Sequence, residues 1–330
     1  MTANHPTVDL NIEAEENLDD NDSTYEGSLG DASYTTSVTS SVKNYKYENG
    51  RRYHSFKEGE YILPNDEQEQ DRMDLNHHIY RTCLGGRLFL APVPENVHRV
   101  LDLGTGTGIW AIDFADDHPS AEVIGNDLSP IQPSWIPPNC KFEVDDFESP
   151  WSYTQPFDFI HAREVEGMIK DYDKLFEQAY KNLIPGGFVE FQSIEAKIYG
   201  DETIQKAKSF LRWRDLVVEA AEIFGKSMVS LPTWPEKMKK AGFINVKTEQ
   251  RILPFGPWAK DEKLKELGRY HQLQMFQAIG AYSYAPFTRT LGWTPEEVEV
   301  LAEAVRKDLQ DRTVHGYTKI HFVYAQKPLE

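Results

Sequence analysis

The chain has 330 residues and a formal net charge of −18, with 53 acidic and 35 basic side chains. No basic stripe is visible, so we expect no direct contact with nucleic acid. No apolar run reaches the roughly 20 residues that cross a bilayer, so we expect no membrane span. Cys83 and Cys140 form neither a disulfide framework nor a metal-binding pattern, and we expect no metal. Because no secretory leader pattern is visible, we expect a cytoplasmic or nuclear protein, or one found in both places.

Residues 1–44 differ in composition from the rest of the chain. The first 42 residues contain nine Asp or Glu and no Lys or Arg, and residues 35–41 are rich in Ser and Thr. Such a segment buries too little apolar surface to offset its chain entropy, so we expect a disordered acidic tail. A phosphorylated regulatory tail is the alternative. We expect residues 45–330 to form one domain, whose first part, residues 45–97, is either a lid over a ligand or a strap on the sheet.

A glycine-rich turn follows a short buried-strand pattern at Val100–Leu103. Gly104, Gly106 and Gly108 have the spacing G-x-G-x-G, whereas pyrophosphate-binding dinucleotide folds have G-x-G-x-x-G. Glycines allow a positive φ and a close approach of ligand to backbone, and the amides of a following helix point at that ligand. The turn therefore predicts a ligand site, although glycines after a strand can also be a plain turn.

Asp102 lies two residues before the first glycine, and Thr105 lies within the turn. A carboxylate here suits a ligand with a cationic amino-acid end and no phosphate, and S-adenosylmethionine is such a ligand. We therefore expect Asp102 and Thr105 to bind this cofactor together with the three glycines. Asp102 can also cap the amides of the loop without touching a ligand, and a dinucleotide oxidoreductase is the remaining alternative.

Two further acidic positions end the next two strand patterns. Asp127 closes the run Val123–Asp127, where an acid can accept hydrogen bonds from both hydroxyls of a ribose, and we expect Leu128 beside it to bind the cofactor as well. Asp145 and Asp146 end the third strand, where a carboxylate can bind the adenine amino group with Phe147 beside the ring. The alternatives are a turn or helix cap at Asp127 and a solvated loop end at Asp145 and Asp146.

Strands and helices alternate over residues 98–192, the expected cofactor-binding half. A strand at Phe157–His161, a helix at 172–183 and a strand at Phe188–Phe191 continue the series. This alternation predicts an α/β fold with a parallel sheet covered on both faces. Ligands of such sheets bind at the carboxyl ends of the strands, where the glycine turn and the acids fall.

Residues 193–330 are expected to hold cap insertions and the last strands. The patterns predict helices near 203–224, 233–241, 261–279 and 294–309, and strands at Ile244–Gln250 and Tyr317–Ala325. The whole then fits a class I methyltransferase, a Rossmann-like seven-stranded sheet with helical cap insertions, in which the last strand lies antiparallel between the fifth and the sixth. The cap carries aromatic residues that either form its core or line a substrate pocket: Trp213, Trp234, Trp258, Phe276, Tyr282, Tyr284 and Phe287.

Methyl transfer needs positioning above all, and a base only where the accepting atom carries a proton. His161 and Glu190 near the carboxyl edge, and His54 on the expected lid, are the weak candidates for that base. Glu164 and Glu166 in the same region are further candidates for the base. Each of these side chains has a structural alternative, so the catalytic residues stay open.

The chain resembles the LaeA-like methyltransferases of filamentous fungi, class I enzymes that depend on S-adenosylmethionine. The resemblance is carried by Gly50–His54, Leu63–Arg72, Leu101–Asp113, Gly125–Pro133 and Leu291–Trp293, and it extends over residues 45–328. It implies a link to fungal secondary metabolism, with methylation of a natural product or of a protein. It also implies an alternative: a regulatory subunit of secondary metabolism and development that acts through velvet-type partner proteins with little or no catalysis. Thr105 stands where many such enzymes have Cys or Ser.

Overall fold

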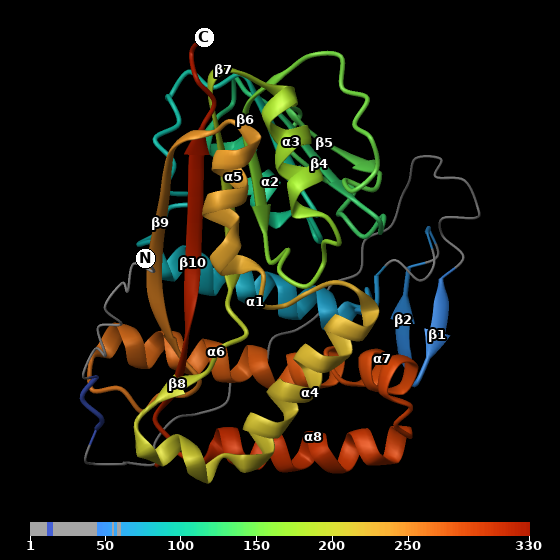
Figure 1. The fold of residues 1–330 in the computed structure, drawn as a ribbon, viewed down its shortest axis with the longest axis vertical. Coiled ribbons are helices and arrows are strands. Elements are labelled where there is room, and N and C mark those ends of the chain that lie inside the picture. Colours follow the sequence, from blue (N-terminus) through green and yellow to red (C-terminus); the bar gives the residue numbers. More distant parts are fainter. Residues whose placement is uncertain (1–11, 16–44, 55, 58–60) are drawn as a thin grey trace.

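The computed structural model describes residues 12–15, 45–54, 56–57 and 61–330. It contains a mixed central sheet with helices on both faces and a helical cap at one end (Figure 1). In spatial order the sheet contains β5 (Cys140–Val144), β4 (Glu122–Asp127), β3 (Arg99–Leu103), β6 (Phe157–Arg163), β7 (Leu183–Ile194), β10 (Gly316–Gln326) and β8 (Tyr199–Gly200), while β9 (Ile244–Pro254) also pairs with β10.

The sheet has the topology expected from the sequence. Strands β5, β4, β3, β6 and β7 pair in parallel, and β10 pairs antiparallel with both β7 and β9. Strand β10, the last in the chain, therefore lies between β7 and β9, which are the fifth and sixth strands predicted from the sequence. The two-residue strand β8 is an addition that the sequence did not predict, because it consists only of a pairing with Gly316 and Tyr317 at the start of β10.

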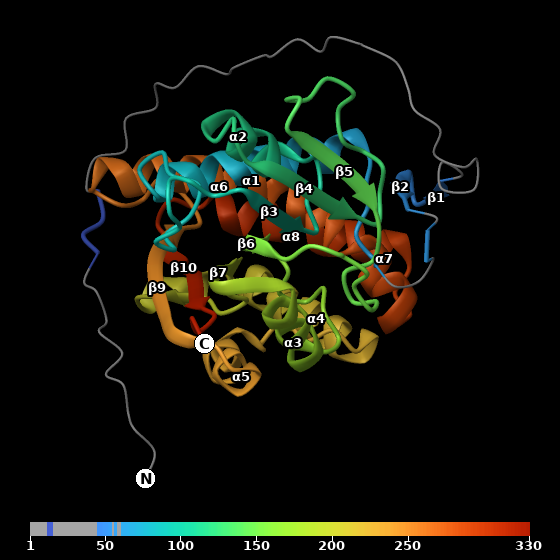
Figure 2. The same ribbon diagram turned by 90° about the horizontal axis from the view of Figure 1, so that it is seen from above.

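Helices cover both faces of the sheet and build the cap (Figure 2). They are α1 (Glu67–Cys83), α2 (Ile109–Asp117), α3 (Tyr172–Asn182), α4 (Lys208–Phe224), α5 (Trp234–Ala241), α6 (Glu262–Ala281), α7 (Tyr284–Pro286) and α8 (Pro295–Gln310), with short helical turns at Glu202–Lys206, Leu231–Thr233 and Phe287–Leu291. Helices α3 and α5 pack on one face around Phe176, Phe191 and Trp234, and α2 packs on the other around Phe114 and Phe159. Each face is thus sealed by its own core.

The cap has a separate apolar core. Phe210 and Val217 on α4 pack with Ile279 on α6 and Val305 on α8. In Figure 1 this layer lies below the sheet, and α1 runs between the two, packed against α6 and α2. The cap therefore faces the sheet across α1.

The helix ends follow the signals in the sequence. Helix α8 begins with a capping box, in which Thr294 accepts a hydrogen bond from the Glu297 amide and the Glu297 side chain accepts one from the Thr294 amide. Helix α1 is capped by Asp66, which accepts from the Glu69 amide. Among the described residues no helix is long and apolar enough to cross a membrane.

The expected acidic tail of residues 1–44 lies outside the described residues except for Ile12–Glu15. This short piece packs on the body of the protein, because Ala14 forms a bridge with Ala259 and Glu15 forms an ion pair with Lys265. The next segment begins with a small hairpin of β1 (Lys46–Glu48) and β2 (Arg51–Tyr53) and continues into α1. The boundary predicted near residue 45 remains a prediction.

Candidate functional site

The glycine turn joins β3 to α2 with three residues in the left-handed region. Gly104, Gly106 and Gly108 have φ values of 63°, 59° and 82°. A Cβ at Gly106 would lie 3.0 Å from the Met73 sulfur, and one at Gly104 would lie 3.3 Å from the Phe147 ring. Side chains are therefore excluded here both by backbone conformation and by space.

Asp127 ties the end of β4 to the glycine turn. Its carboxylate accepts a hydrogen bond from the Gly106 amide at 2.9 Å and another from the Ser129 amide at 2.9 Å. Burial raises the pKa of Asp127 to about 6. Leu128, the next residue in the chain, is half-buried. Because each carboxylate oxygen has two lone pairs, Asp127 keeps capacity to accept hydrogen bonds from a ligand.

Asp102 forms a buried cluster beneath the turn. One oxygen accepts from the Thr105 hydroxyl at 2.6 Å, and the other accepts from Nδ1 of His161 at 2.7 Å. The His161 ring stacks on Trp110 at 3.7 Å, and burial lowers the pKa of His161 to about 4, so the ring is neutral near pH 7. Its Nε2 has no hydrogen-bond partner among the described residues. Asp102 thus links the turn, through Thr105, to strand β6, through His161.

Asp145 and Asp146, the predicted acids that follow β5, lie beside the crevice and do not line it. Asp145 is exposed, and Asp146 binds Lys57, Ser149 and the Glu148 amide. Phe147 packs against Gly104, as its 3.3 Å approach to a Cβ there indicates. These side chains surround the end of β5 without lining the cavities described below.

His54 and Glu190, two of the candidate bases, take part in structural contacts. The ring nitrogens of His54 contact the carbonyl oxygens of Phe56 and Tyr61, at 2.6 and 3.0 Å. Glu190 is fully buried and accepts hydrogen bonds from the amides of Leu90 and Ala91. Neither side chain lines the two main cavities, so their geometry is that of residues that hold loops to the sheet.

A first cavity, the glycine-loop crevice, opens at the carboxyl ends of β3, β4 and β6. It encloses about 720 Å³ and is lined by Tyr61, Leu63, Arg72, Met73, Asn76, His77, Asp102, Gly104, Thr105, Gly106, Thr107, Ile109, Trp110, Asp127, His161, Arg163, Glu164, Met168 and Tyr282. Its walls therefore combine the predicted turn and acids with one face of α1. Six residues between Tyr61 and His77 line this side of the crevice.

Sequence reasoning missed most of the α1 side of this crevice. Arg72, Met73, Asn76 and His77 follow one another at helical spacing, and three of the four are buried although they are polar. A run of polar residues on the inner face of a helix was the available signal. The Asn76 side-chain oxygen is buried without a partner among the described residues, as is Nε2 of His161. Two buried unpaired polar atoms in one crevice indicate a place for a ligand.

A second cavity, the cap cavity, lies between the sheet and the cap helices. It holds about 680 Å³ and is lined by Glu164, Ile194, Glu195, Ala196, Ile198, Phe210, Trp213, Arg214, Val217, Val218, Met228, Phe255, His271, Gln274, Met275, Ala278, Tyr282 and Thr318. Of the cap aromatics, Trp213 and Tyr282 line it, while Trp234 and Phe287 lie in the cores. Glu164 and Tyr282 line both cavities, so the two spaces adjoin.

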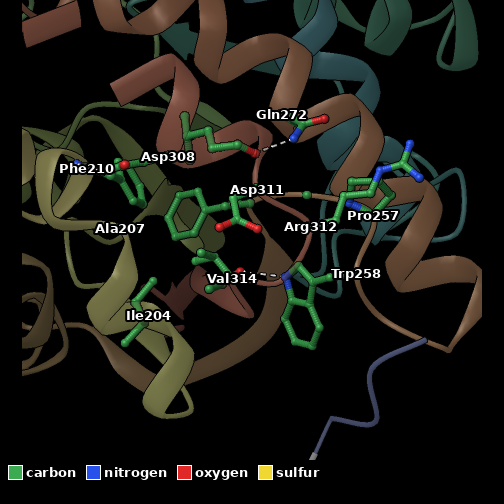
Figure 3. Close-up of a pocket in the computed structure, with 14 residues that line it drawn as sticks. Ile204, Ala207, Phe210, Pro257, Trp258, Gln272, Asp308, Asp311, Arg312 and Val314 are labelled. Carbon is green, nitrogen blue, oxygen red and sulfur yellow. Dashed lines mark hydrogen bonds between the residues drawn. The ribbon is translucent and has the colours of Figure 1, made fainter. Parts of the chain in front are cut away.

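A third hollow at the far end of the cap is smaller, about 340 Å³ (Figure 3). Its polar groups are paired within the protein: the Gln272 amide donates to the Leu309 carbonyl, and the Trp258 indole donates to the Gly316 carbonyl. Asp308 accepts from the Ser209 and Phe210 amides. The hydrogen bonds around this hollow therefore connect α4, α6 and α8.

Comparison with known proteins gives the family. The model of a methyltransferase domain matches residues 75–248. Methyltransferase pytC of Aspergillus terreus is 42% identical over 303 residues, covering 91% of this chain and 94% of pytC. Secondary metabolism regulator LAE1 of Cochliobolus heterostrophus is 37% identical over 289 residues, covering 85% of this chain and 94% of LAE1. Protein-methionine methyltransferase laeA of Emericella nidulans is 36% identical over 286 residues, covering 86% of this chain and 76% of laeA.

The fold, the glycine turn and this likeness define a class I methyltransferase that depends on S-adenosylmethionine. Within that class, the chain belongs to the LaeA-like fungal methyltransferases. The crevice fits the cofactor, because a turn without side chains, an acidic acceptor at Asp127 and two unpaired polar atoms meet there.

Proposed function

We propose that this methyltransferase acts on an apolar small molecule seated in the cap cavity. The observation that carries the proposal is that Glu164 and Tyr282 line both the cap cavity and the glycine-loop crevice. The walls of the cap cavity are mostly apolar and aromatic with a few polar groups, which is the usual lining of small-molecule sites in proteins.

The predicted cofactor residues have separate roles in this proposal. Gly104, Gly106 and Gly108 form the backbone cradle, and Asp127 accepts hydrogen bonds from the ribose hydroxyls. Asp102 and Thr105 hold the cradle in shape. Leu128, Asp145, Asp146 and Phe147 surround the adenine end, where Phe147 already contacts the turn. When bound, the cofactor supplies an electrophilic methyl group on a sulfonium.

The remaining work of the chain is alignment and exclusion of water. Tyr61, Leu63 and one face of α1 form a wall of the crevice. Holding two reactants in line removes most of the entropic barrier of their encounter, which in well-oriented reactions amounts to roughly 7–11 kcal/mol. We also propose that residues 45–330 act as one methyltransferase domain. Limited proteolysis of the full chain should then cut within residues 1–44 first.

A second candidate is methylation of a protein, because laeA of Emericella nidulans carries the name protein-methionine methyltransferase and is 36% identical. In that case the cap cavity receives a protruding side chain. The velvet-type partners and the nuclear location implied by the family belong to this candidate, as does a regulatory role with little catalysis.

Transfer of labelled methyl from S-adenosylmethionine into an extract of the source organism tests the proposal. The extract is divided into protein and small-molecule fractions, and Gly106→Val serves as the cofactor-deficient control. Label in the small-molecule fraction that the variant does not produce supports the proposal. Label on protein alone supports the second candidate and contradicts the first. Absence of label in both fractions, despite cofactor binding, would favour the non-catalytic regulator.

A further inference from the structure

Glu164 holds its carboxylate in a fixed position where the two cavities meet. It directly follows β6 and has a φ of 56°, a left-handed conformation that is uncommon for residues with a side chain. Its Oε1 accepts hydrogen bonds from the Tyr80 hydroxyl and from the Ile194 amide at 3.1 Å. No described residue donates a hydrogen bond to its Oε2. One oxygen is thus anchored and the other is left to meet a ligand.

Strained backbone conformations persist where the surrounding structure enforces them, often at functional sites. Here the enforcing contacts come from α1 and β7, which bind the same oxygen from two sides. A residue whose only role was to fill space would not need this conformation or these contacts.

The charged and titratable groups around Glu164 come from three elements. Tyr80 and Arg72 face it from α1, Arg163 from β6, and Tyr282 from the end of α6. Burial raises the pKa of Glu164, although the Tyr80 hydrogen bond and the Arg72 charge act in the opposite direction. The carboxylate is therefore a stronger base than an exposed glutamate.

The far wall of the cap cavity holds a second unpaired group. Gln274 on α6 is only 4% exposed, and its side-chain oxygen has no hydrogen-bond partner among the described residues. Glu195 also has a buried oxygen without a partner in this part of the chain. Nδ1 of the nearby His271 donates a hydrogen bond to the Pro254 carbonyl, and burial lowers the pKa of His271 to about 4, so this ring adds no positive charge. Such acceptors match a ligand that carries a further hydrogen-bond donor.

We propose that the cap cavity takes an apolar compound with an acidic hydroxyl, a phenol or an enol, and that Glu164 accepts the proton of this hydroxyl. The proposal rests on the proposed small-molecule function and adds the class of acceptor and the residue that receives the proton. A second donor on the same compound pairs with Gln274.

The bonds and charges balance in one step. The hydroxyl oxygen of the acceptor forms a bond to the methyl carbon while the sulfur–methyl bond breaks and its electron pair remains on sulfur. The hydroxyl proton passes to Oε2 of Glu164 and leaves to solvent when the products depart. A methionine thioether has no proton to lose, so a protein-methionine acceptor would not need Glu164 as a base.

Glu164→Gln is the test variant, because glutamine keeps an oxygen for Tyr80 and the Ile194 amide but cannot take a proton. We expect methyl transfer into the small-molecule fraction to fall by about 10²–10⁴-fold, the usual contribution of a general base. Affinity for S-adenosylhomocysteine, measured by calorimetry, should stay within about twofold. The matched control is Glu166→Gln: its buried carboxylate binds Ser230 and the Leu231 amide outside both cavities. This control should transfer methyl at close to the normal rate.

The pH profile separates a base from a merely structural residue. The kcat/KM of the wild type should fall as the pH is lowered, because Glu164 becomes protonated, and this fall should be absent in Glu164→Gln. The labelled product should pass into ethyl acetate and resist mild alkali, as a methyl ether does and a methyl ester does not. Ala278→Phe, which places a ring in the cap cavity, should lower transfer at least tenfold with unchanged affinity for S-adenosylhomocysteine.

The outcomes distinguish this inference from the proposed function. Label in the small-molecule fraction that is unaffected by Glu164→Gln, or that alkali removes, overturns the inference and leaves the proposed function standing. Label on protein only, or no label that depends on the glycine turn, overturns both. Loss of label and of the acid limb of the pH profile in Glu164→Gln, with Glu166→Gln active, supports both.

Discussion

The glycine-loop crevice and the cap cavity adjoin but are built in different ways. The floor of the crevice comes from the short continuous segment Asp102–Gly108 and from Asp127 at the end of the next strand. Within this floor the Thr105 hydroxyl donates to Asp102 at 2.6 Å, and the Gly106 amide donates to Asp127 at 2.9 Å. The cap cavity is lined by side chains from β7, α4, α6 and β10, which extend along the chain from Ile194 to Thr318, and its walls are mostly apolar.

The difference shows how one chain can keep its cofactor while its acceptor varies. Backbone conformation and a few fixed hydrogen bonds determine the crevice, so almost any substitution there disturbs it. Apolar packing determines the cap cavity, and hydrophobic side chains of similar volume replace one another at modest cost. Changes in the crevice should therefore affect cofactor binding, whereas changes in the cap should affect the acceptor or stability alone.

The largest expected effect is that of Gly106→Val on cofactor binding. Valine would have to adopt the φ of 59° and would meet the Met73 sulfur, so the cradle cannot form around a ligand. We expect affinity for S-adenosylhomocysteine to fall by more than about 100-fold, or more than ~2.7 kcal/mol, measured by calorimetry.

Gly225→Val is the matched control, since Gly225 ends α4 with a φ of 83° and has nothing within 4 Å of a Cβ. It should lower stability through backbone strain but leave the affinity unchanged. A similar loss of affinity in both variants would mean that strain anywhere in the chain, and not the cradle itself, is responsible.

Asp127→Asn should have the next largest effect. Removing the charge weakens the hydrogen bonds to the ribose. A hydrogen bond to a charged acceptor contributes ~1.5–3 kcal/mol, so we expect the affinity for S-adenosylhomocysteine to fall about 10- to 100-fold. Since burial raises the pKa of Asp127 to about 6, affinity of the wild type should fall as the pH is lowered through 6. The variant should show no such dependence in calorimetric titrations between pH 5 and 8. The same pH dependence of affinity in both proteins would contradict a ribose-binding role for Asp127.

Glu190→Gln should affect stability and not chemistry. The variant leaves buried amide groups poorly paired, so we expect the free energy of unfolding to fall by about 1–3 kcal/mol, with methyl transfer within threefold of normal. Burial raises the pKa of Glu190 to about 7 from an ordinary 4.5. The stability that the wild-type carboxyl contributes is therefore fully present below about pH 4.5 and is lost as the pH rises from there through 7. Urea unfolding should show the difference between the two proteins shrinking from pH 4.5 to 7. A large loss of transfer in folded protein would restore Glu190 as a catalytic candidate.

Thr294→Ala should have the smallest effect. It removes the capping box of α8 in the cap and should cost about 1 kcal/mol of stability in urea unfolding. Affinity for S-adenosylhomocysteine should not change, because α8 does not reach the crevice. A weakened cofactor site in this variant would show that the two regions are coupled more closely than their separate cores suggest.

Much of the fold could be read from the sequence because its signals are local. The alternation over residues 98–192, the turn at Gly104–Gly108 and the cap at Thr294 each depend on neighbours within one turn or one strand. The strand β8 and the division of the expected helix 203–224 into a short turn and α4 could not be predicted. They depend on contacts with Gly316 and with the cap core, which no local pattern reveals.

The alternation of strands and helices, the glycine turn and the family resemblance can all be recognised in the sequence, because each depends on residues close together in the chain. The folded structure was needed to show that Glu190 and His54 face loop backbones, that His161 is stacked and neutral, and that Arg72 and Met73 of α1 line the crevice. It also placed Glu164 between two cavities, next to Tyr80. The physical reason is that burial and pairing of a side chain depend on elements far along the chain, whereas the backbone conformation of a turn depends on its own few residues.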